Sequence, residues 1–157
     1  MTGDRAPDAA SGSLLSRRRV LLVVAAGLVP WVVVPYETGA SLVFSFGLVT
    51  PPSLALESVV RYVAVDTVAL PPRLLAWPVA SLLYALAVAS TALALVGRED
   101  RRVTAGLFGL AGLDVLYFAL TFSTLRLRVL ALPLGVVVLF LAAWESRPDA
   151  WGLRLDG

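Results

Sequence analysis

Few side chains in this sequence could do chemistry. The 157 residues include neither Cys nor His, so disulfide bonds, thiolate or histidine catalysis, and zinc or haem sites built on these ligands are excluded. All 13 basic residues are arginine, and they lie scattered between apolar runs. A nucleic-acid-binding surface needs a clustered basic face. We therefore expect no catalytic residue, no cofactor, no metal ion and no nucleic acid.

Asp114 is the acid that stands out, because it lies near the middle of an apolar segment, residues 103–122. An ionisable residue inside a membrane segment is by default a candidate proton relay or ion ligand. The alternative is a hydrogen-bonded acid that joins two helices. Tyr84, in the preceding apolar segment, would lie at a similar depth and is the first candidate partner. No second carboxylate, lysine or histidine accompanies Asp114, so we favour the structural role.

Small residues recur at helical spacing in the same two apolar segments. Such residues let helix backbones approach closely within a bilayer. They could form a dimer face, but contact between the two segments of one chain is the favoured interpretation. The candidate packing face consists of Ser81, Ala85, Ala89, Ala105 and Gly109.

Three further carboxylates, Glu37, Glu57 and Asp66, lie between the first and second apolar segments. They could be considered as an acid/base pair or a calcium site. Their spacing fixes the geometry of neither. We expect solvated surface side chains.

The elements that carry these residues are predominantly apolar. Hydrophobic residues make up 59% of the chain, against roughly 45–50% in soluble domains. Charge-free or nearly charge-free runs favour membrane-spanning helices. The sequence predicts an all-α membrane protein, a bundle of four transmembrane helices. The four predicted spans cover residues 20–36, 73–97, 103–122 and 129–144.

The predicted bundle occupies residues 18–144, between cytoplasmic tails at 1–17 and 145–157. Residues 37–72 form an extracytoplasmic excursion, in which 40–49 alternates weakly like a strand. Ser53–Leu70 has the length of a span but carries three charges, each costing roughly 2.5–3.5 kcal/mol at a helix centre. We predict an amphipathic helix at the outer surface, with a fifth span as the alternative.

Arginine positions predict the orientation. With four spans, nine arginines are cytoplasmic and four are outside, which the positive-inside rule favours over the five-span count. Residues 98–102 are a short charged turn, at which the chain must reverse. This turn and both termini then face the cytoplasm of a multi-pass cell-membrane protein. Residues 16–22 also resemble the start of a twin-arginine export signal, but no A-x-A cleavage site follows.

Several short motifs together resemble an uncharacterised family of small polytopic membrane proteins from halophilic archaea. The resemblance covers about residues 18–144. It implies a lineage and a shared outer segment, and it transfers no activity or catalytic residue. The motifs are Pro35-Tyr36-Glu37-Thr38-Gly39, Phe46-Gly47-Leu48-Val49, Leu75-Ala76-Trp77-Pro78, Glu99-Asp100-Arg101-Arg102-Val103-Thr104-Ala105-Gly106 and Ala131-Leu132-Pro133.

Two functional classes follow from these features. The favoured one is a non-enzymatic accessory or scaffold protein that binds another membrane protein, or a second copy of itself, within the lipid bilayer. The alternative is a small transporter or channel subunit that uses Asp114. A transporter predicts further polar groups converging on Asp114, whereas a scaffold predicts an isolated acid and an apolar outer patch.

Overall fold

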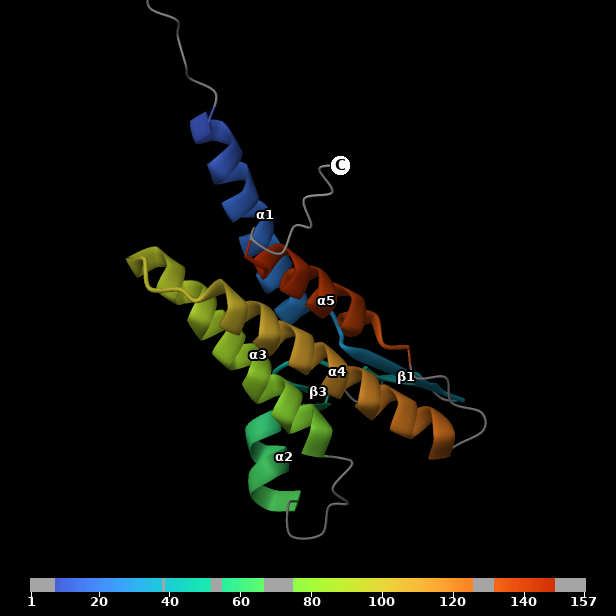
Figure 1. Cartoon of the computed structure of the whole chain (residues 1–157). Helices are drawn as coiled ribbons and strands as arrows, with labels where there is room; N and C mark the ends of the chain where they lie inside the picture. The colour runs from blue at the N-terminus through green and yellow to red at the C-terminus, as the bar shows by residue number, and fades with distance from the viewer. Residues whose placement is uncertain (1–7, 38, 52–54, 67–74, 126–131, 149–157) are drawn as a thin grey trace, which may run out of the picture.

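The computed structural model describes residues 8–37, 39–51, 55–66, 75–125 and 132–148. Figure 1 shows long helices lying side by side, with strands behind them. The elements, in chain order, are α1 (Asp8–Leu28), β1 (Val32–Tyr36), β2 (Gly39–Val43), β3 (Gly47–Thr50), β4 (Ala55–Ser58), α2 (Val59–Asp66), α3 (Ala76–Ala92), the 3-10 helix η2 (Leu93–Val96), α4 (Arg101–Leu125) and α5 (Leu134–Ser146).

The predicted all-α fold class is wrong, because strands β1 to β4 form an antiparallel sheet in the order β1-β2-β3-β4. The first predicted span, residues 20–36, fails for this reason. α1 ends at Leu28, and the residue before Pro30 is sterically disfavoured in a helix. The run of valines that opens β1 is β-branched and favours a strand. The chain therefore changes from helix to sheet halfway along that segment.

The predicted excursion is built mainly of strands. The weak alternation in residues 40–49 does mark strands β2 and β3. A single amphipathic helix was predicted for Ser53–Leu70, but its described residues form β4 and then α2, and Glu57 lies in β4. Glu57 and Arg61 therefore cannot pair along one helix face.

The later apolar segments are helical. Within the described residues, two helices are long and apolar enough to cross a membrane, over Ala76–Val96 and Arg101–Thr121. α5 is apolar but has 13 residues. Length and composition are weak evidence, because core helices of soluble proteins meet the same criteria. These findings overturn the four-helix transmembrane bundle.

The chain reverses between α3 and α4 at the predicted charged turn. Gly97 adopts a left-handed conformation (φ 67°) that ends η2, a common helix stop that glycine adopts without strain. Asp100 then caps α4, because its carboxylate accepts the backbone N–H groups of Arg102 (2.9 Å) and Val103 (3.4 Å). α3 and α4 consequently run antiparallel (Figure 1).

Two tryptophan side chains connect the sheet region to the helices through hydrogen bonds and ring packing. Trp31, fully buried between α1 and β1, donates its indole N–H to the carbonyl of Ala26 at 2.7 Å. Its ring packs edge-on against Tyr84 of α3, with ring centroids 5.7 Å apart. Trp77 of α3 donates to the carbonyl of Phe44 at 2.9 Å. Each indole thus satisfies its polar group while burying its apolar ring.

Candidate functional site

A buried ion pair joins the middle of α1 to the turn between α3 and α4, which is remote in sequence. Arg19 of α1 is 9% exposed, and its guanidinium binds both carboxylate oxygens of Glu99, with Nη1–Oε2 at 2.8 Å. Its Nε donates to the Ser146 hydroxyl of α5 at 3.2 Å. The fork of donors matches the carboxylate, so the pair is charge-assisted and bidentate. α1, the α3–α4 turn and α5 meet here.

Two hydroxyl groups complete this cluster. Thr104 of α4 lies 3.0 Å from Glu99 Oε1 and can donate its single proton to that carboxylate. The Ser90 hydroxyl of α3 lies 2.6 Å from that of Thr104 and then donates to it. We call Arg19, Glu99, Ser146, Thr104 and Ser90 the arginine clamp. Its groups satisfy one another, and in the fold it joins the middle of α1 to neighbouring ends of α3, α4 and α5.

The arginine clamp lowers the pKa of the Glu99 carboxyl group. Burial raises its pKa, but the hydrogen bond and charge of Arg19, the Thr104 hydroxyl and the Arg101 charge outweigh burial and hold the pKa below its ordinary value. The folded state therefore favours the ionised form. By linkage, this contribution to stability is present above the unfolded pKa and is lost as the pH falls through the folded pKa.

We expect Glu99→Gln to remove this pH dependence. The difference in unfolding free energy between wild type and Glu99→Gln should be constant above about pH 5 and shrink as the pH falls below about 4, since an unfolded glutamate titrates near 4.3. Denaturant titration in detergent at a series of pH values measures it. A difference that stays constant between about pH 7 and about pH 3 would contradict the assignment.

The arginine clamp was not predicted from the sequence, because Arg17, Arg18 and Arg19 were counted alike as cytoplasmic arginines. The structure exposes Arg17 and Arg18 and buries Arg19. Arg19 shares a helical face with Val23 and Ala26, which are also buried. The spacing of Arg19, Val23 and Ala26 along one helical face was the feature of the sequence that could have indicated burial of Arg19. Its partner Glu99 could not be identified, because 80 residues separate the two.

Asp114 lies on α4 at the edge of an apolar face. Leu110, Leu113 and Tyr117 around it are 53%, 53% and 55% exposed, and Asp114 itself is partly exposed. Among the described residues, no side chain hydrogen-bonds or ion-pairs with its carboxyl group. The predicted partner Tyr84 instead donates its hydroxyl to the carbonyl of Val23 at 2.8 Å.

The predicted small-residue face is divided. Ser81 is buried and bonded to the Trp77 carbonyl at 3.1 Å, whereas Ala85 and Ala89 are exposed. Ala105 and Gly109 are partly exposed, and a Cβ built on Gly109 meets no atom within 4 Å. α3 packs through another stripe, which includes Ala80 and Ala87.

The outer carboxylates are separated along the chain. Glu37 is exposed beyond β1, and Glu57 is half-buried in β4. Asp66 ends α2, and its side chain lies outside the described part of the structure. Across the described residues, no group of three acidic, histidine or cysteine side chains could hold a metal ion.

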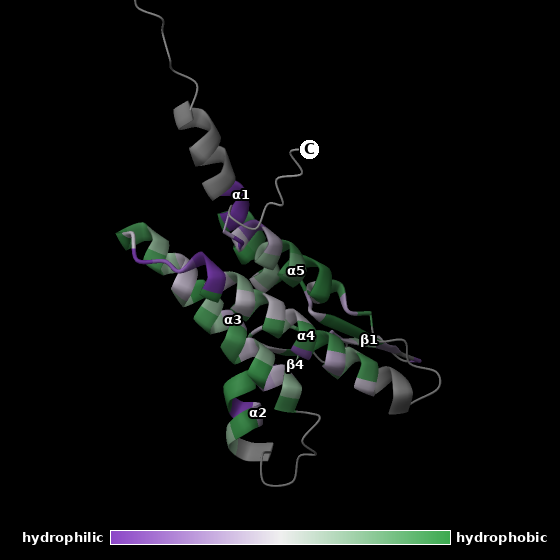
Figure 2. Ribbon diagram, viewed as in Figure 1, coloured by the Kyte–Doolittle hydropathy of each residue, from purple (hydrophilic) through white to green (hydrophobic). Residues whose placement is uncertain are grey.

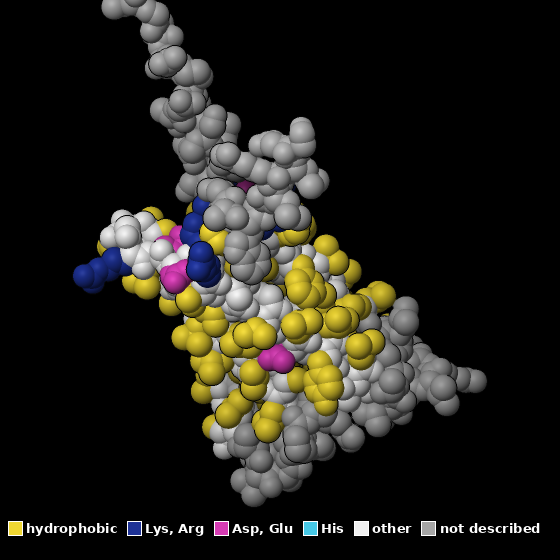
Figure 3. Space-filling model, viewed as in Figure 1, with side chains coloured by type: hydrophobic (Ala, Val, Ile, Leu, Met, Phe, Trp, Pro, Cys, Tyr) yellow, Lys and Arg dark blue, Asp and Glu magenta, His cyan; other side chains and the backbone are white. Residues whose placement is uncertain are grey.

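Hydrophobic and basic side chains occupy different regions of the surface. In Figure 3 hydrophobic side chains cover the face over α3, α4 and α5, and basic ones gather at one end. Figure 2 shows the same division along the ribbons. Seven of the eight arginines in the described ranges (17, 18, 19, 98, 101, 102 and 147) lie near the arginine clamp, and Arg61 in α2 is the exception.

The comparisons with known proteins give a family without an assigned activity. A family model described as a domain of unknown function, DUF8050, matches residues 1–152. No curated protein matches the chain. No solved structure matches it.

Proposed function

Since the chain belongs to the DUF8050 family, a domain family of unknown function, we propose a function from its geometry. The protein is a non-enzymatic accessory or scaffold protein of the cell membrane. It binds another membrane protein through the exposed face of α4 around Asp114. This face consists of Leu110, Leu113, Asp114 and Tyr117 and is called the Asp114 face below.

The observation that supports this proposal is that, among the described residues, no side chain pairs with Asp114, which lies on an apolar surface. A carboxyl group facing lipid near a helix centre costs roughly 2.5–3.5 kcal/mol on insertion scales. Such residues normally face a bundle interior or another polar group. A helix of a second protein that covers the Asp114 face would shield the carboxyl group and supply a donor. The large exposed leucines and Tyr117 around it provide the packing area.

A transporter or channel subunit would require polar groups converging on Asp114. Among the described residues the positions one helical turn away from Asp114 are hydrophobic or aromatic, and seven of the eight arginines lie at the other end of the helices, near the arginine clamp. This arrangement favours the scaffold over the transporter. It also fits the criterion that separates the two classes, an isolated acid within an apolar patch.

The orientation is part of the proposal. Because the arginine-rich end contains the start of the apolar part of α1, the α3–α4 turn and the end of α5, both termini are proposed to face the cytoplasm. The chain has no Cys, so a single introduced cysteine can be tested with an impermeant reagent. Arg98 is the suitable site, because it is exposed. Labelling of an Arg98→Cys variant in intact cells would contradict this orientation.

The lineage in halophilic archaea stays a prediction.

The partner contact is tested by photo-crosslinking in native membranes. A photoreactive residue at Leu113 should give a discrete adduct with one membrane protein, identified by mass spectrometry. The matched control is Val60 on α2, which is 77% exposed and belongs to a helix other than α4. An adduct with a second copy of the chain would make the face a dimer contact. Equal non-specific labelling at both positions would reject the proposal.

Substitution of Asp114 separates binding from folding. We expect Asp114→Leu to change the unfolding free energy by no more than about 0.5 kcal/mol, as for surface sites without special contacts, and to abolish the adduct. Asp114→Asn, which keeps the size and a hydrogen-bond acceptor, should retain part of it. Thermal unfolding in detergent and adduct yield are the measurements. Destabilisation by Asp114→Leu of several kcal/mol would instead show a structural role within the chain.

A further inference from the structure

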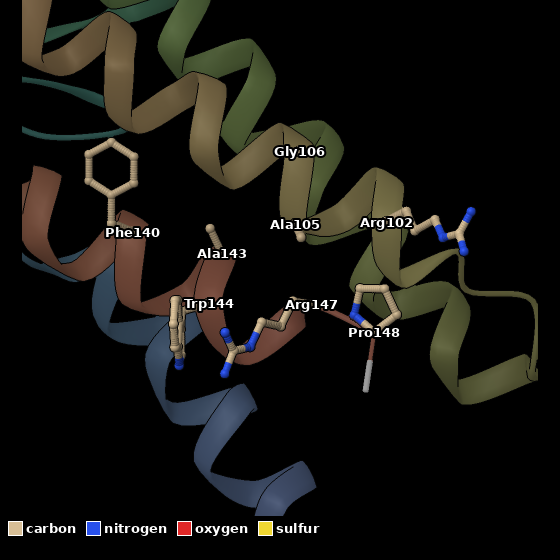
Figure 4. Close-up of a pocket in the computed structure, with 8 residues that line it drawn as sticks. All are labelled: Arg102, Ala105, Gly106, Phe140, Ala143, Trp144, Arg147 and Pro148. Carbon is tan, nitrogen blue, oxygen red and sulfur yellow. The ribbon is translucent and has the colours of Figure 1, made fainter. Parts of the chain in front are cut away.

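A groove of about 430 Å³ lies between α4 and α5, at the arginine-rich end of the molecule. Figure 4 shows Ala105 and Gly106 of α4 across from Phe140 and Ala143 of α5. The volume is within the range of small-molecule sites, roughly 300–1,000 Å³. The lining residues are Arg102, Ala105, Gly106, Phe140, Ala143, Trp144, Arg147 and Pro148.

Small residues on α4 create this hollow. A Cβ built on Gly112 would already touch Phe140 at 3.4 Å, so the two helices are in close contact there. Nearer the start of α4, a Cβ on Gly106 or Gly109 meets no atom within 4 Å. The side-chain volume missing at these positions leaves an apolar space that is open to the surface.

The charged residues among those that line the groove are both positive. Arg102 and Arg147 flank it, and no carboxylate is among its lining residues. The Arg147 guanidinium lies over the Trp144 ring, 3.3 Å from its centroid. Arg102 is exposed and directs its guanidinium outward at the edge of the groove (Figure 4). A phosphate bound at the mouth of the groove would require this long side chain to change rotamer and turn toward it.

We propose that this groove binds an anionic phospholipid of the membrane. The phosphate lies at the mouth, where Arg102 and Arg147 supply planar guanidinium donors that suit phosphate oxygens. One acyl chain lies against Ala105, Gly106 and Phe140. A soluble phosphate compound would leave the apolar walls unused, whereas a lipid matches both halves of the groove. Exposed Trp144 (62%) suits the membrane–water interface.

Lipid binding rests on the proposed membrane location. It does not depend on the proposed protein contact at the Asp114 face. The groove lies between α4 and α5, and the Asp114 face lies farther along α4. Loss of the crosslinked adduct and loss of lipid binding are therefore separate outcomes. Lipid binding is tested on purified protein, in which no partner is present.

The test compares lipids by native mass spectrometry and thermal unfolding of the full chain in detergent. Phosphatidylglycerol should bind with a roughly tenfold preference over phosphatidylcholine of the same acyl chains, because each arginine near an anionic headgroup adds to the attraction. The double variant R102Q/R147Q should lose this preference. Gly106→Leu should reduce binding of both lipids, because its side chain fills the groove.

Arg98→Gln is the matched control, because Arg98 is exposed in the neighbouring turn and does not line the groove. It should keep the preference. Equal binding of the two lipids, or a preference that survives R102Q/R147Q, overturns the proposal. Inorganic phosphate that stabilises the protein as much as phosphatidylglycerol would show a small-anion site and would also overturn it. If Gly106→Leu fails to fold, the arginine variants decide the question.

Discussion

Arg19→Ala is expected to lower the free energy of unfolding by about 3–5 kcal/mol, because it leaves a buried carboxylate without its counter-charge. Both side chains of the pair are nearly inaccessible, with 11% and 8% of the side chains of Arg19 and Glu99 exposed. The substitution also removes the donor to Ser146, so α1 loses its side-chain hydrogen bonds from this position to α5 and to the turn between α3 and α4. Denaturant titration in detergent measures the loss.

The adjacent residue provides the control. Arg18 has 69% of its side chain exposed and lies 3.9 Å from Glu145. Exposed pairs of this kind contribute about 0–1 kcal/mol, so Arg18→Ala should have little effect. The double variant R19L/E99L should recover much of the lost stability, because an apolar pair replaces both buried charges. Equal effects of Arg18→Ala and Arg19→Ala would refute the clamp.

Gly135→Ala is expected to destabilise the fold by about 3 kcal/mol or more, at the upper end of overpacking effects. A Cβ at this position would lie 2.5 Å from the Trp31 ring and 2.6 Å from the Trp31 Cα. The backbone atom cannot move aside without displacing the start of β1. The Gly135 N–H also donates to the Trp31 carbonyl at 3.1 Å, and this close approach is what attaches α5 to the α1–β1 junction.

Gly109→Ala is the matched helical control, because its added Cβ meets nothing within 4 Å. It should be neutral or stabilising by up to about 1 kcal/mol, the helix-propensity gain of alanine over glycine. Thermal unfolding of both variants under one set of conditions gives the comparison. If both glycines tolerate alanine equally, the contact of α5 with Trp31 is looser than described.

The two proposed binding surfaces use different physical features. The Asp114 face is convex and apolar with one acid, which suits another helix. The groove between α4 and α5 is concave, apolar and rimmed by arginines, which suits a lipid. Both lie on α4, whose small residues and exposed leucines leave it incompletely covered by the rest of the chain.

The sequence by itself determined the later helices and the chemistry that is absent. Long apolar runs fold as helices here even though α4 contains three glycines, and Pro78 lies in the first turn of α3, where proline is tolerated. α3 and α4 therefore lie within or around the segments expected from hydropathy. The charged residues after Gly97 correctly predicted the reversal between them. The lack of Cys and His excludes thiolate and imidazole chemistry in any fold that this chain could adopt.

Only the tertiary structure decided how the apolar residues divide between core, sheet and surface. Val32–Tyr36 is rich in valine like a membrane span, but its backbone pairs with β2 on one side and Val33 bonds to Leu132 on the other, which makes it a strand. Hydropathy measures the apolar content of a segment and does not reveal which distant segment will pair with it.

The sequence also does not reveal which distant residue a charged side chain will contact. Arg19 became buried because Glu99 and Ser146, which are 80 and 127 residues away, meet it at the helix ends. Tyr84 does not pair with Asp114 because its hydroxyl donates instead to the Val23 carbonyl. Depth along a helix can be estimated from sequence position. Rotation about the helix axis, and thus the identity of the contact, depends on how neighbouring helices pack.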